Sequence, residues 1–137
     1  EFDTVLNRHE YFEALEVFRV LQKKGVFLTQ QVGTDNLADL VERFNGRTGY
    51  PTGTPNEVVQ SVENTGFIVK KAEQWHGPMR FFDVGALVYY LKAIPWIVEG
   101  FNVDTHLVQL KELQRELEEN GKLEFTNSRY LIYAEKP

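Results

Sequence analysis

The first 32 residues contain two apolar runs separated by an amphipathic segment, with tight connections between them. Phe2–Leu6 is a short apolar, β-branched run that predicts a buried strand, and Val26–Val32 predicts a second one. Between them, Tyr11–Leu21 carries apolar residues at helical spacing. Residues 23–25, Lys-Lys-Gly, are typical of a helix end at which the glycine takes the left-handed conformation. A strand, a helix and a strand joined so closely favour a parallel crossover, which indicates an α/β protein.

The rest of the chain continues this alternation, giving the order β-α-β-α-α-β-α-α-β. No repeat, low-complexity tract or linker interrupts residues 1–137, so we expect a single domain. The further expected helices are Leu37–Phe44 capped by Asp35, Pro55–Asn64 capped by Thr54 with Glu57, Phe82–Ile94 ended by Pro95, and Asp104–Asn120 closed by Gly121. The further expected strands are Phe67–Trp75 and Arg129–Glu135.

Charge and composition exclude several classes of protein. The formal net charge of −5 argues against a protein that binds nucleic acid along its phosphates. The chain has no cysteine, and His76 and His106 lack ligand spacing with a third donor, so we expect no metal site. No apolar run is long enough to span a membrane and no leader opens the chain, so we expect a cytoplasmic protein. Glu1 opens the chain and Met79 is its one methionine, which predicts a piece of a longer protein.

Four segments, taken in order, resemble the second half of a class I S-adenosylmethionine-dependent methyltransferase from a bacterial branch of that family. The resemblance covers the whole chain and implies a Rossmann-like, mostly parallel sheet whose antiparallel last strand is inserted between its fifth and sixth strands. On this interpretation the four expected strands are the family's fourth to seventh. The segments are FDTVLNRHEYF (2–12), LQKKGVFLTQQVG (21–33), GFIVKKAEQWHGPMRFFDVGALVYYLKAIPW (66–96) and RYLIYAEK (129–136).

The resemblance also implies that part of the cofactor site lies outside this chain. In the family, a glycine-rich loop after the first strand and an acidic residue ending the second hold the cofactor. Gly46, Gly49 and Gly53 do not follow a strand, so we interpret them as turn glycines. We therefore expect the chain to supply mainly the acceptor side of the site and to be inactive alone.

Ligands of open α/β sheets bind beyond the carboxyl ends of the strands, which here selects residues 7–10 and the pair Gln30 and Gln31. The resemblance places the first of these segments near the methionine part of S-adenosylmethionine. Asn7, through its amide, and Arg8, through a bidentate contact to a carboxylate, are candidates for cofactor binding. His9 titrates near neutrality and is the candidate catalytic base. In the alternative interpretation, Asn7 and Glu10 cap the following helix and His9 is simply exposed.

Gln30, Tyr89, Tyr90 and Trp96 are further candidates for substrate binding. Gln30 and Gln31 interrupt an apolar strand, and at most one of them faces the pocket because successive side chains alternate; a role in solvating the strand end is the alternative. Tyr89, Tyr90 and Trp96 supply flat rings that can stack on a planar substrate, although such a stripe also suits a core.

We therefore expect methyl transfer to a small-molecule acceptor in the parent protein. A non-catalytic binding or assembly module of the same fold is one alternative. An rRNA-base methyltransferase is another, because Pro95-Trp96 loosely resembles an aromatic segment of a ribosomal guanine methyltransferase. A different α/β enzyme lacks support, since the chain has no phosphate loop or paired catalytic carboxylates. A homodimer is expected through the apolar edge Phe2–Leu6 or through Phe81–Trp96.

Overall fold

The computed structural model describes residues 1–48 and 53–137, which form two compact units. Unit 1 comprises Glu1–Thr34, Thr52–Trp75 and Ser128–Pro137, and unit 2 comprises Asp35–Pro51 and His76–Asn127. That residues 1–137 are one part of a larger methyltransferase domain stays a prediction. Gly49 lies outside the described residues. The elements are β1 (Phe2–Arg8), α1 (Ala14–Val20), β2 (Leu21–Val32), α2 (Ala38–Arg43), α3 (Pro55–Asn64), β3 (Ile68–Phe81), α4 (Val84–Ala93), α5 (Leu107–Asn120) and β4 (Leu123–Glu135).

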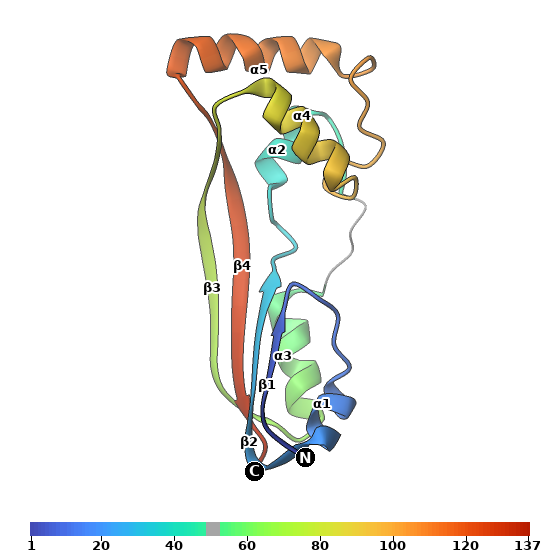
Figure 1. Ribbon diagram of the computed structural model, residues 1–137, viewed down its shortest axis with the longest axis vertical. Helices are drawn as coiled ribbons and strands as arrows, with labels where there is room; N and C mark the ends of the chain where they lie inside the picture. Colours follow the sequence, from blue (N-terminus) through green and yellow to red (C-terminus); the bar gives the residue numbers. More distant parts are fainter. Residues whose placement is uncertain (49–52) are drawn as a thin grey trace. The chain divides into compact units, whose positions relative to one another are not determined.

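The described strands form a four-stranded sheet in the order β1-β2-β4-β3 (Figure 1). β1 runs parallel to β2, which places Asn7 beside Thr29 and Arg8 beside Gln30. β4 runs antiparallel to β2, with Gln30 beside Leu131. The last strand is therefore inserted between the second and the third. This confirms the predicted α/β fold, including the position of its antiparallel last strand.

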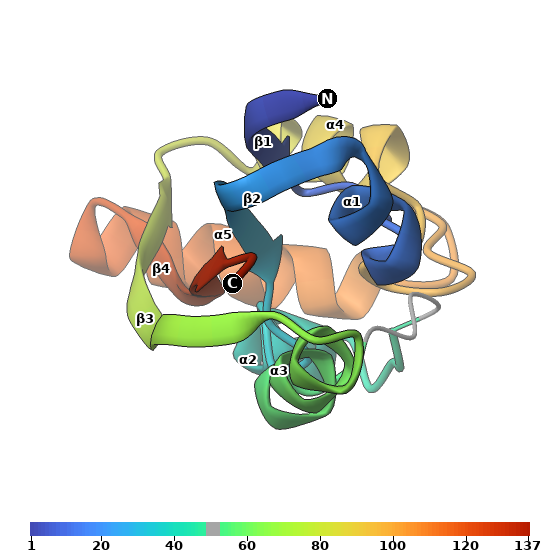
Figure 2. The same cartoon turned by 90° about the horizontal axis from the view of Figure 1, so that it is seen from below.

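The core of unit 1 lies between the sheet and the helices α1 and α3, which both cover the same face (Figure 2). Alternate residues of β2 point into this core, as the twofold period of a strand requires. Phe27 is fully buried there; its ring meets Phe12 edge-on at 4.9 Å between centroids and lies 5.9 Å from Phe67. The predicted capping box of α3 is confirmed, since Thr54 and Glu57 bond each other's backbone N–H groups.

The junction between α1 and β2 differs from the expectation. The helix predicted over Tyr11–Leu21 spans only Ala14–Val20, because Leu21 already pairs with Phe2 of β1 and is fully buried. Lys24, and not Gly25, takes the left-handed conformation, with φ 64°. Glycine is required at position 25 for a steric reason instead, since a Cβ atom there would lie 2.8 Å from the Gln22 carbonyl oxygen.

Unit 2 has a core of its own, built from α2, α4, α5 and the adjoining ends of β3 and β4. The helix predicted over Phe82–Ile94 begins at Val84, because the Asp83 side chain accepts a hydrogen bond from the Ala86 N–H and caps it. The helix predicted over Asp104–Asn120 begins at Leu107, and its closure by Gly121, with φ 76°, is confirmed.

Asp35 does not cap α2, which corrects the expectation for this helix. Leu37 precedes the helix with φ 55° and no side-chain cap. The carboxylate of Asp35 instead lies 2.7 Å from His76 Nε2. The pairing of these two side chains takes Asp35 away from the helix start.

Both late strands are longer than predicted. β3 continues from Trp75 to Phe81, and β4 begins at Leu123 rather than Arg129. Gly77 and Pro78 are residues that usually end a strand, but β3 continues through them because it is an edge strand, where proline is tolerated.

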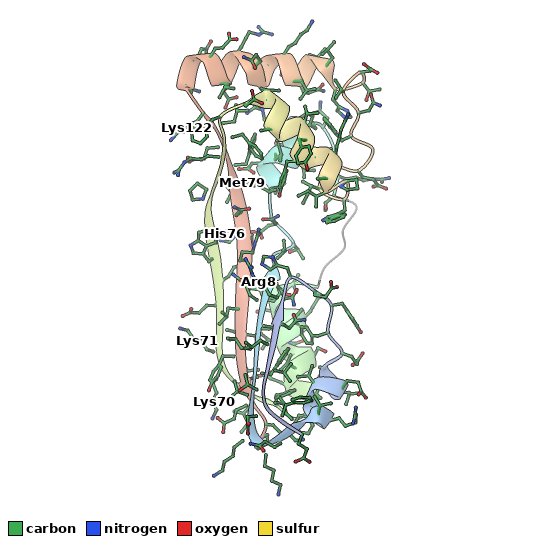
Figure 3. All side chains as sticks on the ribbon, in the orientation of Figure 1. Arg8, Lys70, Lys71, His76, Met79 and Lys122 are labelled. Carbon is green, nitrogen blue, oxygen red and sulfur yellow. The ribbon has the colours of Figure 1, made fainter. Side chains whose placement is uncertain are left out.

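The two edges of the sheet differ in character. The β3 edge carries Lys70, Lys71 and Glu73, and such charges discourage pairing with another strand (Figure 3). The predicted burial of Phe2–Leu6 is wrong for this chain, because β1 is the other edge strand. Phe2 is 60% exposed and Leu6 71% exposed. The β1 edge is therefore apolar, in contrast to the charged β3 edge.

Replacing Lys24 with glycine is expected to raise the free energy of unfolding by about 1 kcal/mol, because glycine adopts positive φ without a steric penalty. The backbone hydrogen bond from Lys24 N to Lys136 O, 2.8 Å long, is retained in this variant. Urea denaturation measures the change. Lys23→Gly is the matched control and is expected to lower stability, since Lys23 does not have positive φ. A destabilised Lys24→Gly variant would contradict the strain argument.

Candidate active site

Polar side chains gather where the parallel strands β1 and β2 end. Asn7 and Thr29 are neighbours across the two strands, and so are Arg8 and Gln30. Because successive side chains of a strand point to opposite faces, the two pairs lie on different sides of the sheet. The carboxyl end of the parallel pair therefore presents two separate polar groups.

The first group, the Asn7–Thr29–Gln31 network, lies on the face that α1 and α3 cover. The hydroxyl of buried Thr29 donates to Asn7 Oδ1 at 2.8 Å, and Gln31 Nε2 donates to the same oxygen at 2.7 Å. Gln31 Nε2 also lies 2.9 Å from the Glu10 carbonyl oxygen, which ties the loop after β1 to the network. These contacts fix the Asn7 carboxamide, so that its amino group is a pre-oriented donor.

The predicted alternative for Asn7, a helix-capping role, is wrong. The residue before α1 is Glu13, and its side chain makes no capping hydrogen bond. Glu10 does not cap this helix either; its carboxylate accepts a hydrogen bond from the neighbouring Tyr11 N–H at 3.0 Å. Both side chains act in the loop between β1 and α1.

The second group contains Arg8, His9 and Gln30. Arg8 Nε donates to Gln30 Oε1 at 3.2 Å, and the His9 backbone N–H donates to the Gln30 carbonyl at 2.8 Å. His9 is exposed, as the alternative interpretation expects. Partial desolvation lowers the pKa of His9 from its ordinary value, and the positive charges of Arg129 and Arg8 lower it further. A lowered pKa keeps the imidazole neutral near pH 7, the form in which it can accept a proton. That His9 acts as a base stays a prediction.

A cleft of about 460 Å³, here called the open-face cleft, adjoins Gln30 in unit 1. It lies on the face opposite the Asn7–Thr29–Gln31 network, so only one of the two glutamines faces it, in agreement with strand alternation. Its lining residues are Gln30, Glu73, Gln74, Trp75, Arg129, Tyr130 and Leu131.

Sequence reasoning did not find Trp75 and Arg129 as site residues. Arg129 lies beside Val32 at the carboxyl end of β2 because β4 is antiparallel to that strand. Trp75 comes from β3, on the far side of β4. Neither position carries a local motif, and the order of the strands is what brings both residues to the open-face cleft.

The predicted aromatic residues belong to unit 2, whereas Gln30 belongs to unit 1. Tyr89 is 76% exposed and Trp96 is 44% exposed. Tyr90 is half-buried, and its ring contacts Phe81 edge-on at 5.5 Å between centroids, which fits the alternative of a core residue. A common substrate site for these four residues stays a prediction.

Two further properties concern metals and membranes. Among residues 1–48 and 53–137, no three histidine or acidic side chains are grouped closely enough to hold a metal ion. His106 stacks on the Phe101 ring at 5.5 Å between centroids. Across the helices that the structure describes, none combines the length and the apolar character needed to cross a membrane.

Comparison with known proteins extends the description of the fold. No protein-family model matches the chain, and no curated protein matches it. Among solved structures, a protein of Bacillus halodurans to which methyltransferase activity is ascribed has a TM-score of 0.61 and 16% identity, over 99% of this chain and 64% of its own. The YcgJ protein of Bacillus subtilis has a TM-score of 0.59 and 16% identity, over 98% of this chain and 64% of its own. The cyclase SpnF has a TM-score of 0.50 and 14% identity, over 99% of this chain and 51% of its own.

These likenesses establish the fold, and the reaction has to be argued from the site. The chain spans 64% of the length of each of the two Bacillus proteins. It shares the α/β fold of these solved structures over part of their length.

Proposed function

We propose that this chain supplies the acceptor side of an S-adenosylmethionine-dependent methyltransferase that acts on a small molecule. The observation that carries the proposal is the polar carboxyl end of β1 and β2, with its partly buried Asn7–Thr29–Gln31 network, in a fold shared with the Bacillus halodurans protein. Ligands of open α/β sheets bind at this end of the strands.

Asn7 and Arg8 are the proposed cofactor-binding residues. When bound, S-adenosylmethionine supplies an electrophilic methyl group. The fixed Asn7 carboxamide offers hydrogen bonds in a set orientation, and the exposed Arg8 guanidinium matches a carboxylate in geometry and charge. Because their side chains point to opposite faces of the sheet, Asn7 and Arg8 are proposed to contact different groups of the amino-acid end of the cofactor beyond the end of β1. The groups that would hold its nucleoside end are proposed to lie in a further part of the protein.

His9, Gln30 and the unit 2 rings are proposed to serve the acceptor. Methyl transfer requires an aligned nucleophile that has lost its proton by the time the bond forms. Neutral His9 takes that proton, and Gln30 orients the acceptor from the adjoining strand. Tyr89, Tyr90 and Trp96 are proposed to stack on a planar part of the acceptor. The homodimer and the cytoplasmic location stay predictions.

Calorimetric titration with S-adenosylmethionine tests the proposed function. We expect micromolar binding by a chain extended at its amino end to the length of the Bacillus proteins, and no measurable binding by the 137-residue chain. Tight binding by the shorter chain would refute the division of the site. Failure of the extended chain to bind would refute the methyltransferase proposal.

A second candidate is a protein of this fold that does not transfer methyl groups. The likeness to the cyclase SpnF supports it, because the same fold there serves a different reaction. Mass spectrometry discriminates the two, since a methyltransferase adds one methyl group to its acceptor.

A further inference from the structure

Gln31 has no part in the proposed methyl transfer, yet its side chain contacts the segments that do. Its Nε2 atom donates to three oxygen atoms, those of the Asn7 carboxamide at 2.7 Å, the Thr29 hydroxyl at 2.9 Å and the Glu10 backbone carbonyl at 2.9 Å. An amide nitrogen has two hydrogen atoms, so one of them is shared between acceptors. One half-buried side chain therefore joins β1, β2 and the loop after β1.

The Glu10 carbonyl sets the orientation of every polar group in the Asn7–Thr29–Gln31 network. A backbone carbonyl oxygen only accepts, so the Gln31 atom that faces it is the amide nitrogen. Because this nitrogen also donates to Asn7, the carboxamide of Asn7 has to face it with its oxygen. The Thr29 hydroxyl donates its hydrogen to the same oxygen and accepts from Gln31. The amino group of Asn7 is thereby turned away from both partners.

The loop after β1 depends on contacts from outside because its backbone is strained. His9 has φ 54°, in the left-handed region that a residue with a Cβ atom adopts at an energetic cost. Two hydrogen bonds hold this part of the loop: the His9 N–H donates to the Gln30 carbonyl at 2.8 Å, and the Gln31 side chain donates to the Glu10 carbonyl. The second of these bonds depends on a side chain and can be removed by substitution.

We infer that Gln31 is a positioning residue for both parts of the proposed reaction. Directly and through Thr29, it turns the Asn7 carboxamide so that the N–H groups face the cofactor. Through the Glu10 carbonyl, it holds the loop that presents His9. The inference rests on the proposed function, because that function assigns Asn7 to the cofactor and His9 to the proton. The positioning itself is a property of the chain and can be measured without the reaction.

Amide hydrogen exchange in the 137-residue chain tests the positioning without a cofactor. Gln31→Glu keeps the size of the side chain but removes its N–H groups. We expect the His9 amide to exchange at least about tenfold faster relative to the Phe27 amide of the core, because the loop loses one of its two bonds. Gln31→Met, which has neither a donor nor a charge, is expected to do the same and replaces Gln31→Glu if circular dichroism shows that variant to be unfolded. An unchanged ratio in a folded variant would overturn the inference.

Gln22→Glu is the matched control. Gln22 lies near the other end of β2, and its Nε2 atom donates to Asp3 Oδ1 of β1. The substitution therefore also removes an amide donor between the two strands, but away from the loop. We expect it to leave the exchange ratio and the cofactor affinity unchanged. The same acceleration in Gln22→Glu would show a general loosening of the sheet and would refute a specific role of Gln31.

Cofactor affinity and rate in the extended protein separate the two roles of Gln31. In Gln31→Glu the Asn7 carboxamide is expected to turn over, because its amino group then pairs with the new carboxylate. We expect S-adenosylmethionine to bind at least about tenfold more weakly, and the single-turnover rate at saturating cofactor to fall as well. Unchanged affinity in the folded variant would overturn the inference.

Thr29 variants isolate the contact with Asn7. Thr29→Val removes one bond to Asn7 and none to the Glu10 carbonyl. It is expected to weaken cofactor binding by up to about tenfold, while lowering the rate at saturation less than Gln31→Glu does. Thr29→Ser retains the hydroxyl and is expected to restore the affinity. Equal losses of rate in Thr29→Val and Gln31→Glu would contradict the separate role of the Glu10 contact.

The outcomes distinguish this inference from the proposed function. Faster His9 exchange in the Gln31 variants, with no S-adenosylmethionine binding by the unsubstituted extended chain, supports the positioning and removes the methyltransferase. Cofactor binding by the extended chain, with unchanged His9 exchange in the Gln31 variants, removes the positioning alone.

Discussion

Replacing Phe27 with alanine is expected to lower the free energy of unfolding by about 3–5 kcal/mol. Phe27 is fully buried on β2, an interior strand that pairs with both β1 and β4. Its ring contacts Phe12 and Phe67, so alanine leaves a cavity between the sheet and its helices. Urea denaturation followed by circular dichroism measures the loss.

Leu28→Ala is the matched control for this variant. Leu28 follows Phe27 on the same strand, but its side chain points to the other face and is only half-buried. We expect a clearly smaller loss of stability, because part of the leucine surface is already in water. Equal losses in the two variants would contradict the assignment of the core to the helix-covered face.

Replacing His9 with glutamine is expected to slow methyl transfer by about 10²- to 10⁴-fold in the extended protein, the usual contribution of a general base. The rate of the unchanged protein is expected to rise with pH through an apparent pKa below the ordinary value of a histidine, because partial desolvation and two arginines favour neutral His9. The rate then stays constant at higher pH, since the imidazole is already deprotonated. Single-turnover rates measured across pH check both expectations.

Two variants control the His9 experiment. Arg129→Gln is expected to move the acid limb to higher pH, because the loss of a nearby positive charge raises the pKa of His9. His76→Gln is expected to leave the rate unchanged, since His76 is paired with Asp35 in unit 2. A His9→Gln variant with an unaltered rate would show that another group removes the proton.

The order of the elements was predictable because its signals are local. The capping box of Thr54 and Glu57 fixes the start of α3, and Gly121 marks the end of α5. Errors arose where a distant partner overrides a local preference. Leu21 leaves its helical pattern to pair with Phe2, and Asp35 leaves its expected capping position to pair with His76.

The candidate site was predictable only in part, for the same reason. Asn7, Arg8 and His9 follow a strand directly, so their place at its carboxyl end can be inferred from the sequence. The contacts of Asn7 with Thr29 and Gln31 depend on the register of two strands. The meeting of Trp75 and Arg129 at one cleft depends on the strand order of the whole sheet, which no local pattern specifies.

The position of β4 has a consequence for how the protein is made. β4 lies between β2 and β3 but leaves the ribosome after both. During synthesis, the edges of β2 and β3 that later pair with β4 therefore have no strand partner. The charges of Lys70 and Lys71 on β3 are expected to disfavour pairing of this strand with another nascent chain before β4 is made. The parallel pair β1 and β2 can form before β4 is made, and we expect the pairing of β2 and β3 with the rest of the sheet to be completed only when β4 enters between them.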